Sequence, residues 1–242
     1  MRTTRRWKPS AAIAAVLFTS GAYGAHPLNT EDTGTQGKGG WQLEVNGESN
    51  KDGGVHGAQA AVILSYGAAE TVDLQLGLPW QDNGEARGGG DLAAAAKWRF
   101  WEREGFSAGM RAGVTTPTGD ETRGLGNGKP TWAALLIGQY EGERWILLAH
   151  LGYRRNLNTI GERDSIGELS GAVLYKATGQ LKLLVDANRT TNADQESEQK
   201  IHQVVLGAIY SPSKDLDLDI GFRRGNDAAI ERAVMAGITL RW

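Results

Sequence analysis

The feature of this chain that most constrains its fold is an alternation of apolar and polar side chains with a period of two residues. In residues 72–78 every even position is apolar, and the positions between are polar or glycine. Segments 91–100 and 216–223 repeat this pattern with charged residues on the polar side. Because successive side chains of a β-strand point to opposite faces, each segment predicts a strand with one apolar and one polar face.

Weaker alternation in nine further segments brings the expected number of strands to about twelve, each close to the 9–11 residues of a membrane strand. These segments are 41–48, 58–66, 106–116, 131–140, 144–154, 166–175, 180–189, 201–210 and 232–242. Segments 131–140 and 201–210 are apolar on both faces, so their inward face stays open. The mean hydropathy of −0.38 is compatible with a membrane barrel, because a barrel hides its apolar half in every second residue.

The connections between these segments alternate between long and short. Long polar loops are expected near 49–57, 81–90, 118–130, 155–165, 190–200 and 224–231, with tight turns near 67–69, 102–104, 141–143, 177–179 and 211–213. This sidedness is typical of bacterial outer-membrane barrels. In hydrocarbon only a closed ring satisfies every backbone group. The sequence therefore predicts an all-β, transmembrane, antiparallel up-and-down β-barrel.

The first 24 residues have the layout of a cleaved secretory signal peptide. Basic residues, among them Arg5 and Arg6, precede an apolar stretch from Ser10 to Phe18 and a small-residue end at Gly24. The apolar stretch is shorter than the roughly 20 residues of a spanning helix. We expect cleavage after Gly24, with Ala25 as the rival position, then a periplasmic N-terminal extension over 25–40 and an outer-membrane barrel over 41–242.

Composition excludes several kinds of site and partner. Cysteine is absent, so no disulfide or thiolate metal site is expected. The net charge is −2, removal of residues 1–24 makes it more negative, and no basic stripe suggests nucleic acid. The four histidines lack metal-ligand spacing. No cofactor, metal or enzymatic activity is expected, although a lipid hydrolase using His150 or His202 stays the alternative among enzymes.

The apolar positions of each strand are expected to face the lipid, so the positions that alternate with them should face the lumen. By this odd–even rule, which we call parity, one set of polar and charged side chains is expected to line the lumen. These residues are Glu44, Asp73, Gln75, Lys97, Arg99, Arg111, Arg144, His150, Arg154, Glu168, Lys182, Asp186, Asp217, Asp219, Arg223 and Arg241. They either line an aqueous path for solutes or pair across the interior and plug it. We favour a narrow conduit. Inward glycines, which would free space for it, are Gly77, Gly109, Gly113, Gly221 and Gly237.

The last strand indicates how the chain reaches its membrane. Its even positions, from Val234 to Leu240, are apolar and end in Trp242. This resembles the carboxy-terminal signature by which barrel-assembly machinery recognises its substrates. Aromatic residues gather near strand ends, as in the interfacial girdles of membrane barrels. We therefore expect outer-membrane lipid, the assembly machinery and a small-molecule solute as partners.

Three stretches of the chain form a recognisable set: 27–37 leading into Trp41 and Glu44, 90–92 followed by Lys97-Trp98-Arg99-Phe100, and 117–120 with the glycine-rich 124–128. Together they resemble the family of outer-membrane transporters named after the meta-pathway of phenol degradation. The alanine run 93–96 departs from the pattern. The resemblance implies a membrane barrel and suggests transport, without a defined substrate.

The pattern and the resemblance together predict a channel for passive passage of small solutes, aromatic or hydrophobic ones among them. The alternative is a closed structural or surface-interaction barrel that transports nothing. Loop residues Asp120, Glu121, Arg123 and Lys129 are candidates for an inward-folding gate, but plain solvated loop is the favoured interpretation.

Overall fold

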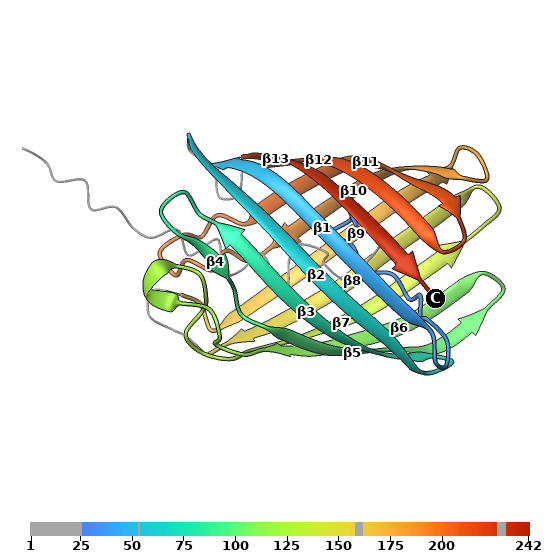
Figure 1. The fold of residues 1–242 in the computed structure, drawn as a ribbon, viewed down its shortest axis with the longest axis horizontal. Helices are drawn as coiled ribbons and strands as arrows, with labels where there is room; N and C mark the ends of the chain where they lie inside the picture. Colours follow the sequence, from blue (N-terminus) through green and yellow to red (C-terminus); the bar gives the residue numbers. More distant parts are fainter. Residues whose placement is uncertain (1–25, 53, 158–161, 227–230) are drawn as a thin grey trace, which may run out of the picture.

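The computed structural model describes residues 26–52, 54–157, 162–226 and 231–242, and these form a single antiparallel sheet (Figure 1). Each strand pairs with its neighbours along the chain, except that the short β4 pairs only with β3, and β5 pairs with β3 instead of β4. The strands are β1 (Trp41–Asp52), β2 (Val55–Ala69), β3 (Val72–Asp82), β4 (Arg87–Gly89), β5 (Ala93–Arg103), β6 (Phe106–Thr115), β7 (Thr131–Glu141), β8 (Trp145–Asn156), β9 (Ser165–Lys176), β10 (Leu181–Thr190), β11 (Ile201–Ser213), β12 (Leu216–Gly225) and β13 (Arg232–Arg241).

The first and last strands close the sheet into a ring. β1 pairs with β13 in a continuous antiparallel register that places Val45 opposite Ile238. Beyond this register, the backbone N–H of Trp41 donates to the carbonyl of Trp242 at 2.9 Å, and the reverse bond is 3.1 Å. All strands except β4 therefore belong to one closed twelve-stranded antiparallel barrel, which confirms the predicted fold.

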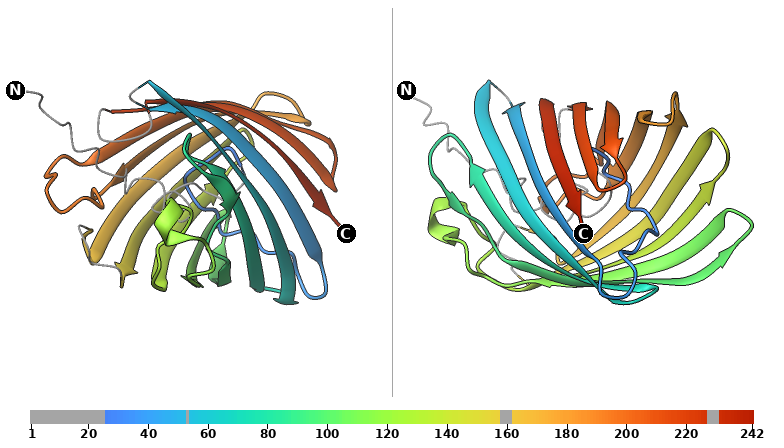
Figure 2. Two further views of the ribbon diagram at one scale, coloured as in Figure 1. Left: turned by 60° about the vertical axis from the view of Figure 1, so that its left-hand side comes forward. Right: turned by 45° about the vertical axis from the view of Figure 1, so that its right-hand side comes forward.

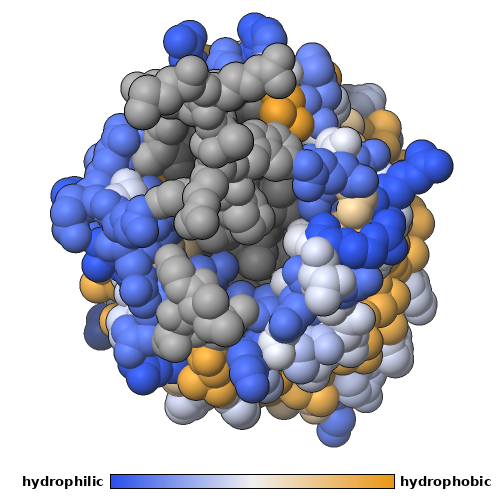
Figure 3. Space-filling model, turned by 90° about the vertical axis from the view of Figure 1, so that its left-hand side faces the viewer, coloured by the Kyte–Doolittle hydropathy of each residue, from blue (hydrophilic) through white to orange (hydrophobic). Residues whose placement is uncertain are grey.

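Alternation along the strands sorts the side chains into an outer and an inner face. On β3, Leu74, Leu76 and Leu78 are exposed, whereas Asp73 and Gln75 are buried inside the barrel. Seen from the end formed by the long connections, the coloured residues of the loops are mostly hydrophilic, and hydrophobic residues show along the right and lower edge of the view (Figure 3). Outward leucines are exposed because lipid, rather than protein, is the solvent on that side.

Aromatic pairs mark the end of the barrel where the short turns lie. Ring centroids are 4.6 Å apart for Trp41 and Tyr66, 4.6 Å for Phe106 and Tyr140, and 4.8 Å for Trp145 and Tyr175. This arrangement is that of an interfacial girdle, where aromatic rings sit at the boundary between hydrocarbon and water.

Three of the connections differ from the expected loops and turns. Residues 49–57 are mostly strand, because β1 and β2 stay paired as far as Asp52 opposite Val55. Backbone pairing continues there beyond the apolar part of the strands. Two turns, expected at 67–69 and 211–213, lie later in the chain because β2 and β11 each continue past a register shift.

The loop between β6 and β7 holds a short 3-10 helix, η1 (Glu121–Arg123). Asp120 caps it by accepting a hydrogen bond from the backbone N–H of Thr122 at 3.0 Å. Hydrogen bonds from Thr122 lower the pKa of the exposed Asp120 carboxyl. The four residues considered as a possible gate are all exposed, as in a solvated loop, whereas Leu125 and Asn127 are buried.

The location of residues 26–36 differs most from the predicted one. Instead of extending from the barrel into the periplasm, they enter its interior (Figure 2). The predicted signal peptide lies outside the described residues, so its cleavage stays a prediction. Within the described ranges, no helix has the length and apolar character needed to cross a membrane.

Candidate functional site: the lumen and residues 26–36

Residues 26–36, which we call the lumen segment, contact the inner wall almost strand by strand. His26 Nδ1 lies 2.5 Å from Asp219 Oδ1 on β12, at one end of the segment. At the other end, the backbone N–H of Gln36 donates to Asp73 Oδ1 on β3 at 3.0 Å. The segment therefore crosses the lumen from β12 to β3, and polar wall residues accept its backbone groups.

Asp186 on β10 anchors the first half of the segment. Its Oδ2 accepts the backbone N–H groups of Asn29 at 2.9 Å and Thr30 at 2.7 Å. The Thr30 hydroxyl also lies 2.7 Å from Ser170 Oγ on β9. Two charge-assisted bonds to one buried carboxylate fix the backbone of this part of the segment.

Lys97 on β5 binds the middle of the segment through two ion pairs. Its Nζ lies 3.0 Å from Glu31 Oε1 and 3.2 Å from Asp32 Oδ1. Arg111 on β6 approaches Glu31 Oε2 at 3.9 Å and donates to Gln75 Oε1 at 2.8 Å. Lys97, Arg111 and Glu31 are almost fully buried, so removing one partner would leave an uncompensated charge.

His150 on β8 is held in one tautomer by its two neighbours. Its Nδ1 accepts the backbone N–H of Glu31 at 3.0 Å, so the ring proton lies on Nε2, which donates to Glu168 Oε1 at 3.2 Å. Ser170 lies opposite His150 in the β8–β9 register, a pairing that parity did not reveal. Its hydroxyl contacts Thr30 and the carbonyl of Ala187. In this arrangement the His150 nitrogens hold the lumen segment and Glu168 rather than activate a serine.

An apolar cluster, mostly on β8 to β11, packs against the start of the segment. Leu28 is 1% exposed and belongs to this cluster, whose other members are the inward residues Leu148, Ala172, Leu174, Leu184, Val205, Ile209 and Met235. The part of the inner wall formed by these residues is therefore apolar.

Several inward glycines make room for the segment rather than for solute. A Cβ on Gly221 would lie 2.7 Å from Pro27 Cβ, and one on Gly207 would lie 3.0 Å from Pro27 Cγ. A Cβ on Gly237 would lie 2.7 Å from His26 Nδ1. The lumen segment occupies the space that these glycines free.

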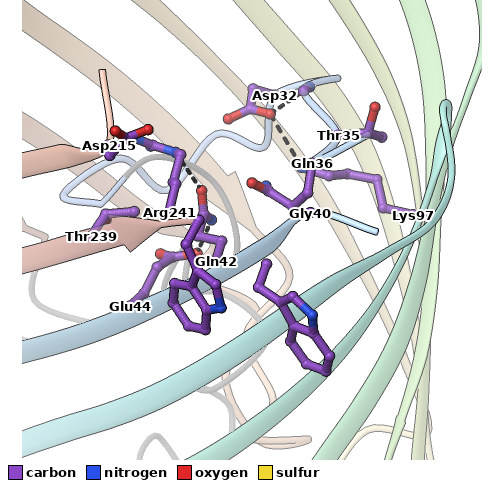
Figure 4. A pocket seen from close by; sticks show the side chains of 13 residues that line it. Asp32, Thr35, Gln36, Gly40, Gln42, Glu44, Lys97, Asp215, Thr239 and Arg241 are labelled. Carbon is purple, nitrogen blue, oxygen red and sulfur yellow. Dashed lines mark hydrogen bonds and ion pairs between the residues drawn. The ribbon is translucent and has the colours of Figure 1, made fainter. Parts of the chain in front are cut away.

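A cavity of about 400 Å³ remains beside the C-terminus, at the short-turn end (Figure 4). Its lining includes Lys97, Arg241, Glu44 and Asp215, together with Asp32 of the lumen segment. Arg241 Nη2 lies 2.8 Å from Asp217 Oδ2, and its Nε donates to Gln42 Oε1 at 2.8 Å. The cavity wall is thus charged and extensively hydrogen-bonded.

Most of the residues predicted by parity do lie on the inner wall. Those that are buried are Glu44, Asp73, Gln75, Lys97, Arg111, His150, Arg154, Asp186, Asp217, Asp219 and Arg223, and those that are partly exposed are Arg99, Glu168, Lys182 and Arg241. Arg144 does not: it is exposed, and its Nη1 donates to the hydroxyl of the outward-facing Tyr175 at 3.3 Å. Any role of these residues in solute passage stays a prediction.

Charges also pair along the wall outside the segment. Arg223 Nη2 lies 2.6 Å from Glu48 Oε1, and both side chains are buried. At the long-loop end, Asn127 Nδ2 donates to Asn156 Oδ1 at 2.7 Å, and Asn156 donates to Glu162. Burial raises the pKa of the Glu162 carboxyl above its ordinary value.

Sequence reasoning missed the site formed by the lumen segment itself. Thr30, Glu31, Asp32, Thr33 and Gln36 all bind the wall. The sequence did contain an indication of it. These residues are polar and were not assigned to a strand, and the predicted inner wall carried many charged groups without an assigned partner. The carboxylates and amides of the wall needed donors, and the nearest unassigned stretch could supply them.

The fold is shared with solved porins. The chain matches the NanC porin with a TM-score of 0.64 at 10% identity, covering 82% of this chain and 98% of that one. An outer membrane channel from Pseudomonas putida F1 matches with a TM-score of 0.64 at 16% identity, covering 87% and 98%. The KdgM porin matches with a TM-score of 0.60 at 10% identity, covering 82% and 98%. No curated protein matches the sequence.

A family model described as "Putative MetA-pathway of phenol degradation" matches residues 25–242. This range includes the whole barrel and the lumen segment, so the family resemblance drawn from the sequence is confirmed. The chain belongs to this family of the phenol-degradation MetA pathway.

Proposed function

We propose that this barrel is a passive outer-membrane channel for small solutes, aromatic or hydrophobic ones among them. The observation that carries the proposal is a closed ring of strands around a polar, charged interior with a cavity of about 400 Å³ at the short-turn end. A soluble barrel would have no reason to expose its leucines and bury Lys97.

The size of the barrel suits a narrow path. Eight strands leave an interior filled by side chains, and sixteen or more leave an open channel. Twelve strands leave room that the lumen segment partly fills, so the segment sets the width of the remaining path. Wall charges such as Arg241 and Glu44 would keep that path hydrated.

The apolar cluster around Leu28 supports hydrophobic or aromatic solutes. Leu148, Leu174 and Ile209 are inward residues that Leu28 covers, so an apolar solute could pack on this part of the wall if it displaced Leu28. A solved structure of the KdgM porin, a barrel of similar fold, is in complex with disordered oligogalacturonate. That polar ligand belongs to KdgM, whereas the apolar wall of this chain favours less polar molecules.

Outer-membrane location is part of the proposal. The outward leucines and aromatic pairs require hydrocarbon around the barrel, and the predicted signal peptide and C-terminal strand would bring it there through the assembly machinery. We propose no enzymatic activity, since both His150 nitrogens are committed to structural hydrogen bonds.

Liposome swelling tests the proposal. Purified, refolded protein should admit small sugars and small aromatic alcohols faster than protein-free liposomes, with a sharp upper size limit. The matched control is a Thr30→Cys/Ser170→Cys variant under oxidising conditions, because these side chains lie 2.7 Å apart and the chain has no other cysteine. Swelling equal to that of protein-free liposomes for every solute would contradict a channel.

A closed structural barrel is the second candidate. The buried ion pairs of Lys97 with Glu31 and Asp32 favour it, because they tie the lumen segment firmly across the interior. It predicts no swelling with the wild type.

A further inference from the structure

We propose that a row of outward-facing cations at the long-loop end binds the phosphate groups of a glycolipid in the outer leaflet of the outer membrane. The row consists of Lys51, Arg189, Arg224 and Arg232, and we call it the cationic row. The inference rests on the outer-membrane location that is part of the proposed function. It names a lipid partner for the outside of the barrel, which neither the fold nor the family supplies.

Strand register brings three of these cations side by side. Arg224 on β12 lies directly opposite Arg232 on β13, and Arg232 lies directly opposite Lys51 on β1. Arg189 continues the row on β10. The strands from β10 to β13 and β1 are neighbours in the sheet (Figure 1), so the row follows one side of the barrel close to its long-loop rim.

Strand alternation places the row on the outer face, just beyond the apolar surface. Arg224 and Arg232 are exposed, whereas Arg223, between Arg224 and the next outward residue, is buried in the lumen. The outward residues two positions further along these strands are Phe222 and Val234, which are 44% and 54% exposed. The cations therefore lie at the level where lipid headgroups meet the hydrocarbon.

The charge of the row has no compensation from the protein. Within the described ranges, its four side chains take part in no ion pair and no side-chain hydrogen bond. Glu231, the residue before Arg232, is exposed and forms no ion pair with it. Like charges directly opposite each other destabilise a sheet. The arrangement of Arg224, Arg232 and Lys51 therefore costs stability unless an anion lies against it.

Outward strand cations on the other side of the same rim have acidic neighbours. Arg155 Nη1 on β8 lies 2.6 Å from Asp164 Oδ2, and Arg87 on β4 lies opposite Asp82 in the register. A surface that carries charge only for solubility mixes both signs in this way. The cationic row departs from that mixture on the side formed by β10 to β1, which indicates a specific anionic partner.

A phosphorylated glycolipid fits both parts of this surface. The guanidinium groups of Arg224 and Arg232 can each bind two phosphate oxygens, because the planar fork matches phosphate geometry. Phe222 and Val234 lie where the acyl chains of such a lipid would pack. A free phosphate would reach only the cations, so the surface favours the lipid over the inorganic anion.

The first measurement is lipid binding by the full protein in detergent, recorded by native mass spectrometry. The probe is lipid A, a glycolipid with two phosphate groups. Arg224→Gln/Arg232→Gln should weaken its binding roughly 25-fold, because each cation near an anionic lipid surface contributes a factor of about five. Glutamine keeps a long polar side chain and removes the charge.

Arg123→Gln/Lys129→Gln is the matched control. Both residues are exposed in the loop between β6 and β7, at the same end of the barrel, so this variant loses two cations outside the row. Its affinity for lipid A should equal that of the wild type. Equal affinities for all three proteins would overturn the proposal. Release of lipid A by an equal concentration of inorganic phosphate would also overturn it, because the row would then be a general anion site.

The second measurement is the unfolding temperature with and without lipid A. Without the lipid, Arg224→Gln/Arg232→Gln should unfold at a higher temperature than the wild type, because the repulsion between opposite cations is lost. Lipid A should raise the unfolding temperature of the wild type more than that of this variant. A variant that unfolds at a lower temperature without lipid would contradict an uncompensated row.

Neither measurement depends on conduction. Failure of the cationic row to bind lipid A would leave the channel proposal intact. Binding of lipid A by a barrel that conducts nothing would support the row and contradict the channel.

Discussion

Lys97 Nζ lies 3.0 Å from Glu31 Oε1, and this ion pair joins the barrel wall to the segment that crosses its lumen. Both side chains are 4% exposed, so neither charge is compensated by bulk water. A pair of this kind is costly to break from one side, because the remaining charge stays buried. The pair therefore makes the position of the lumen segment sensitive to single substitutions in the wall.

Lys97→Met should loosen the lumen segment. Glu31 and Asp32 would lose their cation, so the segment gains by moving toward water. Cleavage at Glu31 by a glutamate-specific protease should become at least tenfold faster, which corresponds to about 1.4 kcal/mol and lies below the 3–5 kcal/mol cost of a broken buried pair. Mass spectrometry of the released peptide measures it.

Lys176→Met serves as the control for that experiment. Lys176 pairs with Glu141 at 2.7 Å in a partly exposed position on the short-turn side, where ion pairs contribute little. Protection of Glu31 in Lys97→Met as complete as in Lys176→Met would show that the pair does not hold the segment.

Gly221→Ala should displace the start of the lumen segment and leave the barrel folded. The added Cβ would lie 2.7 Å from Pro27 Cβ, a contact that Pro27 must move to relieve. We expect the backbone amides of Asn29 and Thr30 to lose hydrogen-exchange protection while the strand amides keep it. Gly171→Ala is the control, because its Cβ meets only the Leu148 carbonyl at 3.6 Å; equal protection in both variants would contradict the close packing.

The pH dependence of the long-loop end follows from Glu162. Burial raises the pKa of this carboxyl from 4.5, so its protonated form is the one that the fold favours. Its contribution is fully present below about pH 4.5 and is lost as the pH rises through the raised value. Glu162→Gln, which imitates the protonated form, should therefore gain thermal stability relative to the wild type as the pH increases. A difference in Tm that stays constant with pH would contradict this account.

The barrel could be predicted well because strand alternation depends only on residues that are adjacent in the sequence. Alternation such as that of Leu74 and Gln75 reports directly on the two faces of a strand. Strand pairing then follows from chain order, since each strand meets its neighbour through a turn. Closure between β1 and β13 follows in turn from the need to satisfy edge groups in lipid.

The contents of the lumen could not be predicted in this way. Contacts such as Thr30 with Asp186 join residues 156 positions apart, and no periodicity reports on them. Parity assigned Asp186 and His150 to the interior correctly, but it does not say whether water or protein meets them there. The glycines at 221 and 237 were interpreted as free space, although Pro27 and His26 occupy it.

Arg144 shows that parity predicts side-chain direction only within a paired strand. The β8–β9 register begins at Trp145 opposite Tyr175, so Arg144 comes just before the first paired residue of β8. The strand alternation no longer fixes its direction there, and its guanidinium turns to the Tyr175 hydroxyl at the outer girdle.

Single-channel conductance of the Thr30→Cys/Ser170→Cys variant tests the central claim most directly, since the disulfide ties the lumen segment to β9. A channel narrowed by this segment predicts a low, steady conductance when the variant is oxidised. After reduction it should match the wild type, and a further Lys97→Met change should raise it above the wild type. Conductance that is the same in all these states, or no conductance in any of them, would contradict a lumen path governed by residues 26–36.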